Sequence, residues 1–258
     1  MSVATGMPRH RRGMPVRRAA AVLAAVLLSA CGAAGGEPPH LTVFAAASLT
    51  EAFKAEAAAF GAAKVDFNFA GSSTLLTQLR QGASADVFAS ADEANMQQAI
   101  GAGLTAEMPR TFATNRLEIV VAPGNPKHIG GLADLARPGV VVVLCAASVP
   151  CGAYAAAALK AAGLALQPAS VETDVKGVVG KVALGEADAG IAYVTDVRAA
   201  GARVSGVSIP NAQNQLARYP IVRLKGGRAQ AAAVAFEELV LSDRGRTILA
   251  RYGFGPPG

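Results

Sequence analysis

Beyond the first forty residues, short strand-like runs alternate with segments whose apolar residues recur at helical spacing. Leu49 and Phe53 mark one such helical stripe, and Val178 and Val182 mark another. Strands that alternate with helices predict an α/β fold with largely parallel sheets, because a helix usually makes the crossover between two parallel strands. The expected strands are 41–46, 65–70, 86–90, 117–122, 140–144, 189–193 and 219–224, and a long helix or helix pair is expected over 229–252.

The chain has 258 residues, more than one average domain of about 100–200 residues. Two long strand-like stretches, 117–123 and 219–224, flank a middle segment that has strands and helices of its own. We therefore expect two lobes joined by two crossings of the chain. Residues 41–120 plus 223–258 are expected to form one lobe, and residues 121–222 the other. A small ligand commonly binds in the cleft between two lobes of this kind.

The positive charge of the chain is concentrated at its amino end. Five of the 24 basic residues are arginines among the first thirty residues, which contain no acidic residue. The remaining 19 basic residues face 18 acidic ones, a net charge of +1. Because binding to phosphate backbones depends on clustered Lys and Arg, a nucleic-acid partner is not expected.

The amino end has the pattern of an export signal. An arginine-rich region precedes the apolar stretch 19–30, which is too short to span a bilayer core that needs about 20 residues in a helix. Residues 1–30 are therefore expected to be a signal peptide. Leu28-Ser29-Ala30-Cys31 resembles a bacterial lipobox, so Cys31 is expected to be lipidated and 31–40 to be a tether. An ordinary cleavage site beside a chance cysteine is the alternative. The expected location is the outer face of the cytoplasmic membrane.

Two cysteines, Cys145 and Cys151, remain in the exported part of the chain. An oxidising compartment favours a disulfide between them, although the geometry at the end of a strand can prevent it, so both states stay open. The sequence has no C-x-x-C motif and no Cys/His cluster, so a metal site built from such ligands is not expected.

Four turns from a strand into a helix carry residues that suit a helix start. Ser48 and Glu51 form the S-x-x-E pattern of a capping box, so Ser48 is expected to cap a helix. Ser72 or Ser73 is expected to cap the next helix, after a glycine that allows close approach of the backbone to a ligand. The four turns are 48–51, 71–74, 148–152 (with Pro150 in a first turn) and 173–175.

These helix starts share a chemistry that suits an anion. Each has backbone N–H groups without partners in its own helix and the positive end of a helix dipole. Ligands of α/β sheets gather beyond the carboxyl ends of strands, where these turns lie, so several starts together predict an oxyanion site without formal positive charge. A single serine at a helix start is usually only a structural cap, and Asp174 suits a first turn for electrostatic reasons alone. Taken one by one, the signals predict only an extracellular α/β binding domain.

The chain contains six longer motifs: VFAAASLT at 43–50, AGSSTL at 70–75, ADVFASAD at 85–92, VPCGAYA at 149–155, GIAY at 190–193 and RYGF at 251–254. Together they resemble those of the molybdate-binding proteins of bacterial ABC importers. The resemblance runs in order over about 41–254 and implies a two-lobed periplasmic-binding-protein fold of type II, with a mostly parallel sheet flanked by helices in each lobe and two hinge crossings. It also implies a protein that is not an enzyme, needs no cofactor, acts as a monomer, closes on a tetrahedral oxyanion and delivers it to a membrane permease.

The resemblance implies five ligand residues, taken over one at a time. Ser48 and Ser72 would donate from hydroxyl and N–H groups of one lobe, Cys151 and Val175 would donate main-chain N–H groups, and Tyr193 would donate its phenol. Cys151 stands where the family commonly has alanine, which matters little to a main-chain donor. A site of donors alone suits a fully deprotonated dianion such as molybdate or tungstate, whereas monohydrogen phosphate needs an acceptor for its proton.

Other functions remain open at this point. A binding protein for sulfate, phosphate or another tetrahedral oxyanion would share the architecture, and a sensor lobe could bind the same ion without transport. A ferric site would need several Tyr, His or carboxylate ligands. An extracellular serine hydrolase is the alternative from another class, but no G-x-S-x-G surrounds Ser48 or Ser72, and His128 is the one candidate base outside the tether.

Overall fold

The computed structural model describes residues 39–258, which belong to one unit by their contacts. The expected signal peptide at 1–30, the lipidation site at Cys31 and most of the tether at 31–40 lie outside the described residues. Within the described part, no helix is both long and apolar enough to cross a membrane.

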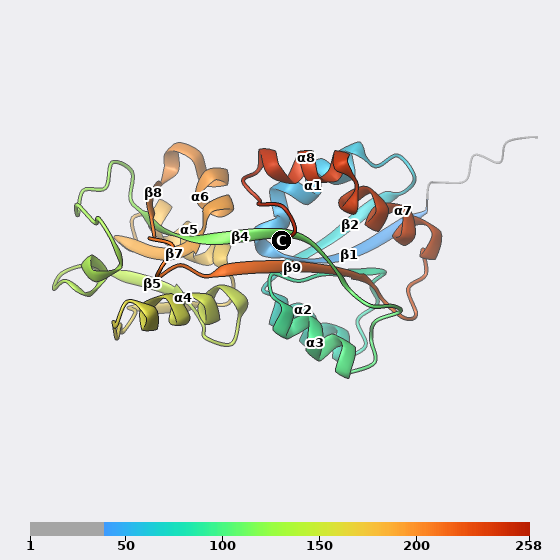
Figure 1. Cartoon of the computed structure of the whole chain (residues 1–258), viewed down its shortest axis with the longest axis horizontal. Coiled ribbons are helices and arrows are strands. Elements are labelled where there is room, and N and C mark those ends of the chain that lie inside the picture. The colour runs from blue at the N-terminus through green and yellow to red at the C-terminus, as the bar shows by residue number, and fades with distance from the viewer. Residues whose placement is uncertain (1–38) are drawn as a thin grey trace, which may run out of the picture. The chain divides into compact units, whose positions relative to one another are not determined.

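Nine strands form a single mixed sheet in the order β2-β1-β3-β9-β4-β7-β5-β6, with β8 paired to β4 (Figure 1). Strands β2, β1 and β3 run parallel to one another, and so do β6, β5 and β7. Antiparallel pairing with β4 and β9 joins these two parallel groups. The strands are β1 His40–Ala46, β2 Lys64–Ala70, β3 Val87–Ala89, β4 Arg110–Val121, β5 Val142–Cys145, β6 Ser170–Glu172, β7 Ala189–Tyr193, β8 Ser205–Ser208 and β9 Leu216–Arg223.

Helices cover both faces of each half of the sheet. Beside β1 and β2, helices α1, α7 and α8 lie on one face, and α2 and α3 lie on the other (Figure 1). Beside β5 and β7, α5 and α6 lie on one face and α4 on the other (Figure 1). The α-helices are α1 Thr50–Ala59, α2 Ser72–Arg80, α3 Glu93–Gly101, α4 Pro150–Ala161, α5 Val175–Ala183, α6 Val194–Ala200, α7 Gln230–Leu241 and α8 Asp243–Arg251; the 3-10 helices are η1 Ala47–Leu49, η2 Leu132–Ala136 and η3 Gly201–Arg203.

The expected α/β fold with two lobes is confirmed. We call lobe 1 the half that holds β1–β3 and lobe 2 the half that holds β5–β8. Strand β4 belongs to both, because Arg110–Arg116 pair with β9 and Leu117–Val121 pair with β7 and β8. Each lobe's sheet is parallel over three strands and turns antiparallel only where β4 and β9 cross between the lobes.

The sequence pattern missed several elements. Strands β6 and β8 were not expected, because they are three and four residues long and contain only one valine each as a large apolar residue. Strand β4 begins at Arg110, seven residues before the expected start at 117, because its polar first half is paired to β9. The closing segment is a pair of helices, α7 and α8.

Phenylalanines form the centre of lobe 1. The ring of Phe53 on α1 lies 5.6 Å from that of Phe112 on β4 and 5.8 Å from that of Phe236 on α7, measured between centroids. The buried side chains Val178 and Ile191 of lobe 2 are aliphatic and smaller. These cores hold the ends of β1 and β7 in place, and the candidate site lies at those ends.

Candidate functional site

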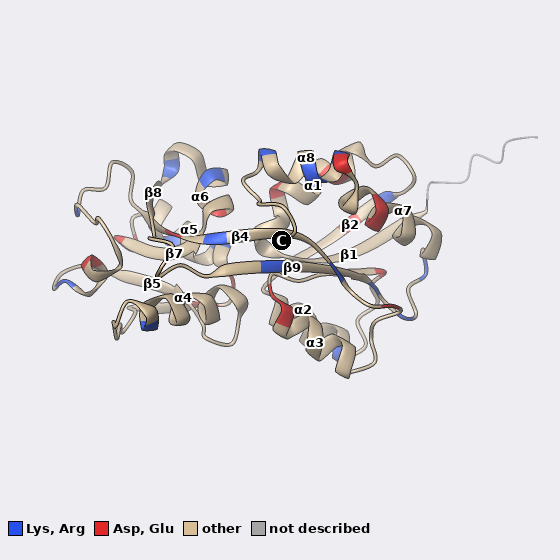
Figure 2. Cartoon of the chain, in the orientation of Figure 1, with Lys and Arg blue, Asp and Glu red and all other residues tan. Residues whose placement is uncertain are grey.

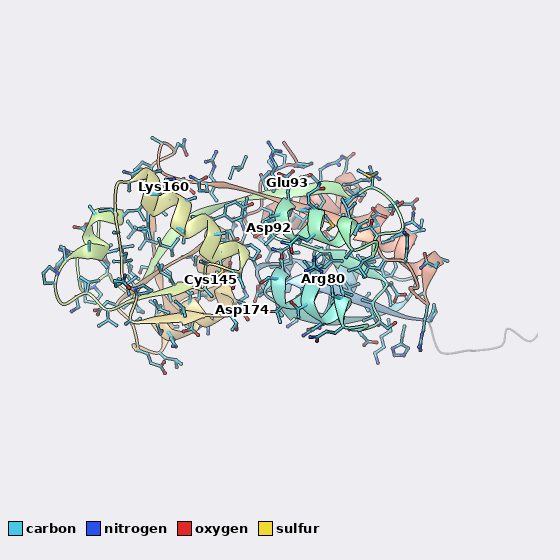
Figure 3. All side chains as sticks on the ribbon, turned by 90° about the horizontal axis from the view of Figure 1, so that it is seen from below. Arg80, Asp92, Glu93, Cys145, Lys160 and Asp174 are labelled. Atoms are coloured by element: carbon cyan, nitrogen blue, oxygen red, sulfur yellow. A yellow bond between two sulfur atoms is a disulfide. The ribbon has the colours of Figure 1, made fainter. Side chains whose placement is uncertain are left out.

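A small cavity lies where the carboxyl ends of β1 and β7 meet the starts of several helices. Its volume is about 20 Å³, a little more than one water molecule needs, so it suits a small ion better than an organic molecule. Figure 3 shows Asp174 at the boundary between the two lobes. Lobe 1 contributes Ala46, Ala47, Ser48, Gly71, Ser72 and Ala91 to the lining, and lobe 2 contributes Val149, Pro150, Cys151, Asp174, Val175 and Tyr193.

All five residues that the resemblance implied as ligands line this one cavity. Ser48 lies in η1, Ser72 is the first residue of α2, Cys151 the second of α4, Val175 the first of α5, and Tyr193 the last of β7. At most 4% of any of them is exposed. The first four N–H groups of an α-helix have no partner within it, so α2, α4 and α5 each bring free donors here.

The two serines do not cap their helices, which corrects the expectation from the sequence. Helix α1 begins at Thr50 and shows no side-chain cap, and the Ser48 hydroxyl lies 2.9 Å from the Tyr219 hydroxyl instead. Helix α2 also lacks a side-chain cap, and Ser72 Oγ accepts a hydrogen bond of 3.0 Å from the Ala91 N–H. Both hydroxyls therefore bond to residues outside their own helices and not to the backbone of those helices. These bonds hold the hydroxyls at the cavity.

The other two turns behave as local chemistry predicts. Asp174 caps α5, because its carboxylate accepts hydrogen bonds from the N–H groups of Lys176 at 2.8 Å and Gly177 at 3.1 Å. The N–H group of Val175, which precedes these two, faces no such side-chain cap. Pro150 is the first residue of α4, where its missing N–H removes no helical hydrogen bond.

The hydroxyl of Tyr193 has no hydrogen-bond partner among the described residues, although the side chain is 1% exposed. Burial, with a smaller contribution from the neighbouring Tyr219, raises the pKa of Tyr193 well above its ordinary value. The phenol therefore stays protonated and remains a donor. A buried polar group left without a partner costs about 1–3 kcal/mol, so this hydroxyl points to a ligand that accepts a hydrogen bond.

No lysine or arginine lines the cavity, and the described residues contain no group of three or more His, Cys, Asp or Glu side chains that could hold a metal ion. Basic and acidic residues are interspersed over both lobes (Figure 2). His128, the candidate base of a hydrolase, is exposed and does not line the cavity. Apart from Asp174, whose carboxylate caps α5, the lining residues offer hydroxyl and backbone N–H donors.

Sequence reasoning missed three groups just outside the cavity. Tyr219 and Asn115 lie behind Ser48, and Lys176 of α5 forms an ion pair of 2.7 Å with Glu51 of α1 and one of 3.1 Å with Asp196 of α6. Tyr219 stood at the start of an expected strand, but nothing in the local pattern indicated which side chain it would meet.

A disulfide joins Cys145 at the end of β5 to Cys151 in the first turn of α4, with 5.8 Å between the Cα atoms. The bond connects the strand directly to the helix start that lines the cavity. The bond uses only side-chain sulfur atoms, so the main-chain N–H donors in the first turn of α4 remain in place.

Comparisons with known proteins agree with this architecture. Residues 41–255 match the family model of bacterial extracellular solute-binding proteins. The "Molybdate-binding protein ModA" of Mycobacterium tuberculosis is 47% identical over 221 residues, which cover 84% of this chain and 85% of that protein. The Escherichia coli protein of the same name is 32% identical, with 90% and 95% covered. The periplasmic molybdate-binding protein of Azotobacter vinelandii has a similar fold, with a TM-score of 0.75 at 22% identity over 84% of this chain and all of that one. The chain belongs to the family of bacterial extracellular solute-binding proteins.

Proposed function

We propose that this protein captures molybdate outside the cytoplasm and delivers it to the membrane permease of an ABC importer. Relatives named as molybdate-binding proteins support this substrate. The observation that carries the proposal is the buried Tyr193 hydroxyl, which has no partner and belongs to a cavity without basic side chains. A solute-binding protein carries its ligand and does not transform it, so no catalytic residue or cofactor is required.

The proposed ligand shell consists of neutral donors from both lobes. Ser48 and Ser72 donate hydroxyl and N–H groups from lobe 1, while Cys151, Val175 and Tyr193 donate from lobe 2. A neutral donor to a charged acceptor contributes about 1.5–3 kcal/mol. The summed contribution of several such donors exceeds the roughly 8 kcal/mol that micromolar binding requires, before the free-energy costs of dehydrating the ion and closing the lobes are subtracted.

Binding is coupled to closure of the lobes in this proposal. Residues 41–120 plus 223–258 move against residues 121–222 about the two crossings, and the anion favours the closed state because only that state surrounds it. The closed protein is then the form that the permease recognises. The protein acts as a monomer.

A lipid on Cys31, after removal of the signal peptide 1–30, would hold the protein near its permease. The L-S-A-C sequence before the tether supports this anchor, and two or more acyl chains give stable attachment. Labelling with a radioactive fatty acid tests it: Cys31→Ser should abolish the label and release the protein from membranes, and a label that persists in this variant contradicts the anchor.

Calorimetry of the purified protein tests the ligand. Molybdate and tungstate are expected to bind with a Kd of about one micromolar or tighter. Sulfate should bind much more weakly if the cavity selects the larger ion. Equal binding of sulfate and molybdate would reassign the protein to a sulfate carrier, the alternative that shares this architecture.

Replacing Tyr193 with phenylalanine tests the site. The variant loses one donor to a charged ligand, so molybdate affinity is expected to fall by about 10- to 100-fold. Its melting temperature without ligand should not fall, because the hydroxyl has no partner to lose. Tyr252→Phe, at a partly exposed tyrosine after α8, is the matched control and should bind like the parent protein. Unchanged affinity in Tyr193→Phe would exclude this cavity as the site.

A further inference from the structure

Tyr219 of β9 lies directly behind the candidate site without lining it. Its side chain is fully buried, its hydroxyl is 2.9 Å from the Ser48 hydroxyl, and its ring packs edge-on against that of Tyr193 with 6.1 Å between centroids. One residue of the crossing strand therefore contacts two of the proposed ligand donors.

The hydrogen-bond directions in this group follow from Asn115 on β4. Asn115 Oδ1 accepts a hydrogen bond of 2.9 Å from the Arg116 N–H, which identifies the opposite atom as the amide nitrogen. That nitrogen can only donate, and it lies 2.8 Å from Thr195 Oγ1 and 3.4 Å from the Tyr219 hydroxyl. Tyr219 oxygen thus accepts from Asn115. The Ser48 oxygen is the one acceptor within reach of the Tyr219 proton among the described residues, and a buried proton without an acceptor is costly, so Tyr219 donates to Ser48.

The consequence at Ser48 is that its own proton points away from Tyr219. Ser48 has no other hydrogen-bond partner among the described residues and it lines the cavity, so a ligand there is the acceptor within its reach. Burial keeps the pKa of Tyr219 far above its ordinary value, so the phenol does not lose this proton at any physiological pH. Ser72 is oriented by the same principle, because its oxygen accepts from the Ala91 N–H, which can only donate.

We propose that Tyr219 is a positioning residue that sets the specificity of the site: by donating to Ser48, it leaves the Ser48 proton for the ligand and so disfavours oxyanions that carry a proton. The inference rests on the proposed molybdate site and deepens it. A hydroxyl that was free to rotate could accept a proton from monohydrogen phosphate. Each serine oxygen keeps a second lone pair, but to turn it toward such an ion the serine would have to point its own proton away from the ligand, where it has no acceptor among the described residues.

The test is a double-mutant cycle with Tyr219→Phe and Ser48→Ala, read by calorimetry with molybdate and with inorganic phosphate at pH 8.5. Tyr219→Phe is expected to weaken molybdate binding by about 3- to 10-fold and to improve phosphate binding relative to molybdate by at least about threefold. In the Ser48→Ala background, the same change should alter molybdate affinity by less than about twofold, because Tyr219 acts through Ser48. Tyr252→Phe is the control.

Asn115→Asp provides a second variant that does not depend on the first. Its carboxylate would accept the Tyr219 proton, so Ser48 would donate to Tyr219 and turn its lone pairs toward the ligand. Molybdate and monohydrogen phosphate both carry two negative charges, so the repulsion from the new carboxylate largely cancels in their ratio. That ratio should shift toward phosphate, as in Tyr219→Phe.

The outcomes distinguish a failure of the proposed molybdate site from a failure of the proposed role of Tyr219. A parent protein that does not bind molybdate, or a Ser48→Ala variant with unchanged affinity, overturns the proposed site itself. Equal losses from Tyr219→Phe with and without Ser48 would show that the phenol acts through packing alone. A molybdate-to-phosphate ratio that stays constant, or phosphate binding too weak to detect in every variant, overturns the role in specificity.

Discussion

Glu56 and Tyr193 are both buried polar residues without hydrogen-bond partners among the described residues, and burial raises the pKa of both. The phenol of Tyr193 is neutral, so leaving it without a partner before a ligand binds costs only a modest free energy. The carboxyl of Glu56, on the inner face of α1, would carry a charge in an apolar surrounding. Burial raises its pKa to about 7, and the positive charge of Arg244 offsets only part of this effect.

This shift predicts that Glu56 destabilises the folded protein as the pH rises. The unfolded carboxyl loses its proton near pH 4.5 and the folded one near 7, so the folded state holds more protons between these values. The free energy of unfolding should therefore fall as the pH rises from about 4.5 to 7, and it should stay low at higher pH. Glu56→Gln is expected to raise the free energy of unfolding by about 1–3 kcal/mol at pH 8 and to change it little at pH 4.5.

Urea unfolding at the two pH values measures this difference. Glu238→Gln, at an exposed position of α7, is the matched control and should show no such dependence on pH. If the free energy of unfolding rises as much at pH 4.5 as at pH 8, the glutamine acts by improving the packing and not by removing a buried charge.

At the scale of elements, an ion pair links the two lobes beside the site. Lys176 follows Val175 at the start of α5 in lobe 2, and its ammonium lies 2.7 Å from Glu51 on α1 of lobe 1. Asp196 on α6, within lobe 2, is 3.1 Å from the same ammonium. Desolvation would lower the pKa of Lys176, but Asp196 and Glu51 more than compensate and raise it, so the lysine stays charged. Burial raises the pKa of Asp196 to about 6, and Lys176 limits the rise.

The contact with Glu51 crosses between lobes, so opening the lobes would break it while the contact with Asp196 remained. Glu51→Gln is expected to speed the dissociation of molybdate by about two- to fivefold, since a partly exposed ion pair contributes about 0.2–1 kcal/mol. Stopped-flow tyrosine fluorescence measures the rate. The difference from the parent protein should shrink at high salt. Glu186→Gln, exposed on lobe 2, should dissociate at the parent rate, and an equal acceleration in that control would remove the special role of Glu51.

At the scale of the whole molecule, the arrangement of the two lobes in the structure leaves no room for a side chain at Gly71. A Cβ atom there would lie 2.5 Å from the carbonyl oxygen of Thr173 and 3.3 Å from Cγ1 of Val149. Both atoms belong to lobe 2, whereas Gly71 belongs to lobe 1. The φ of Gly71 is −58°, which any residue can adopt, so the conflict comes from the approach of the lobes and not from the backbone.

Gly71→Ala is therefore expected to fold normally and to close poorly. Its melting temperature without molybdate should match that of the parent, while the increase on adding molybdate should be largely lost. Small-angle X-ray scattering should show less compaction with ligand than in the parent protein. Gly61→Ala, where an added Cβ meets nothing within 4 Å, is the control. A full increase in melting temperature in Gly71→Ala would mean that the lobes tolerate the extra methyl group.

Local patterns were enough to predict the α/β class, seven of the strands and the turns that carry the site. The hydrophobic period and the residues at helix starts act over a few neighbours, so a single stretch of sequence contains them. Val175 and Pro150 lie at the starts of their helices as expected, for this reason. The closing helical segment was expected for the same reason, with one long helix or a pair left open, whereas Asp174 was expected only to suit a first turn and in fact caps α5.

Interactions between distant residues could not be obtained in this way. Ser48 and Glu51 have the pattern of a capping box, yet Ser48 bonds to Tyr219, 171 positions away, because the sheet order places β9 next to β3 and near the end of β1. The pair of Glu51 with Lys176 spans 125 positions and likewise depends on how the lobes meet. A hydroxyl takes the best partner that folding brings within reach, and a local pattern shows only the partners nearby along the chain.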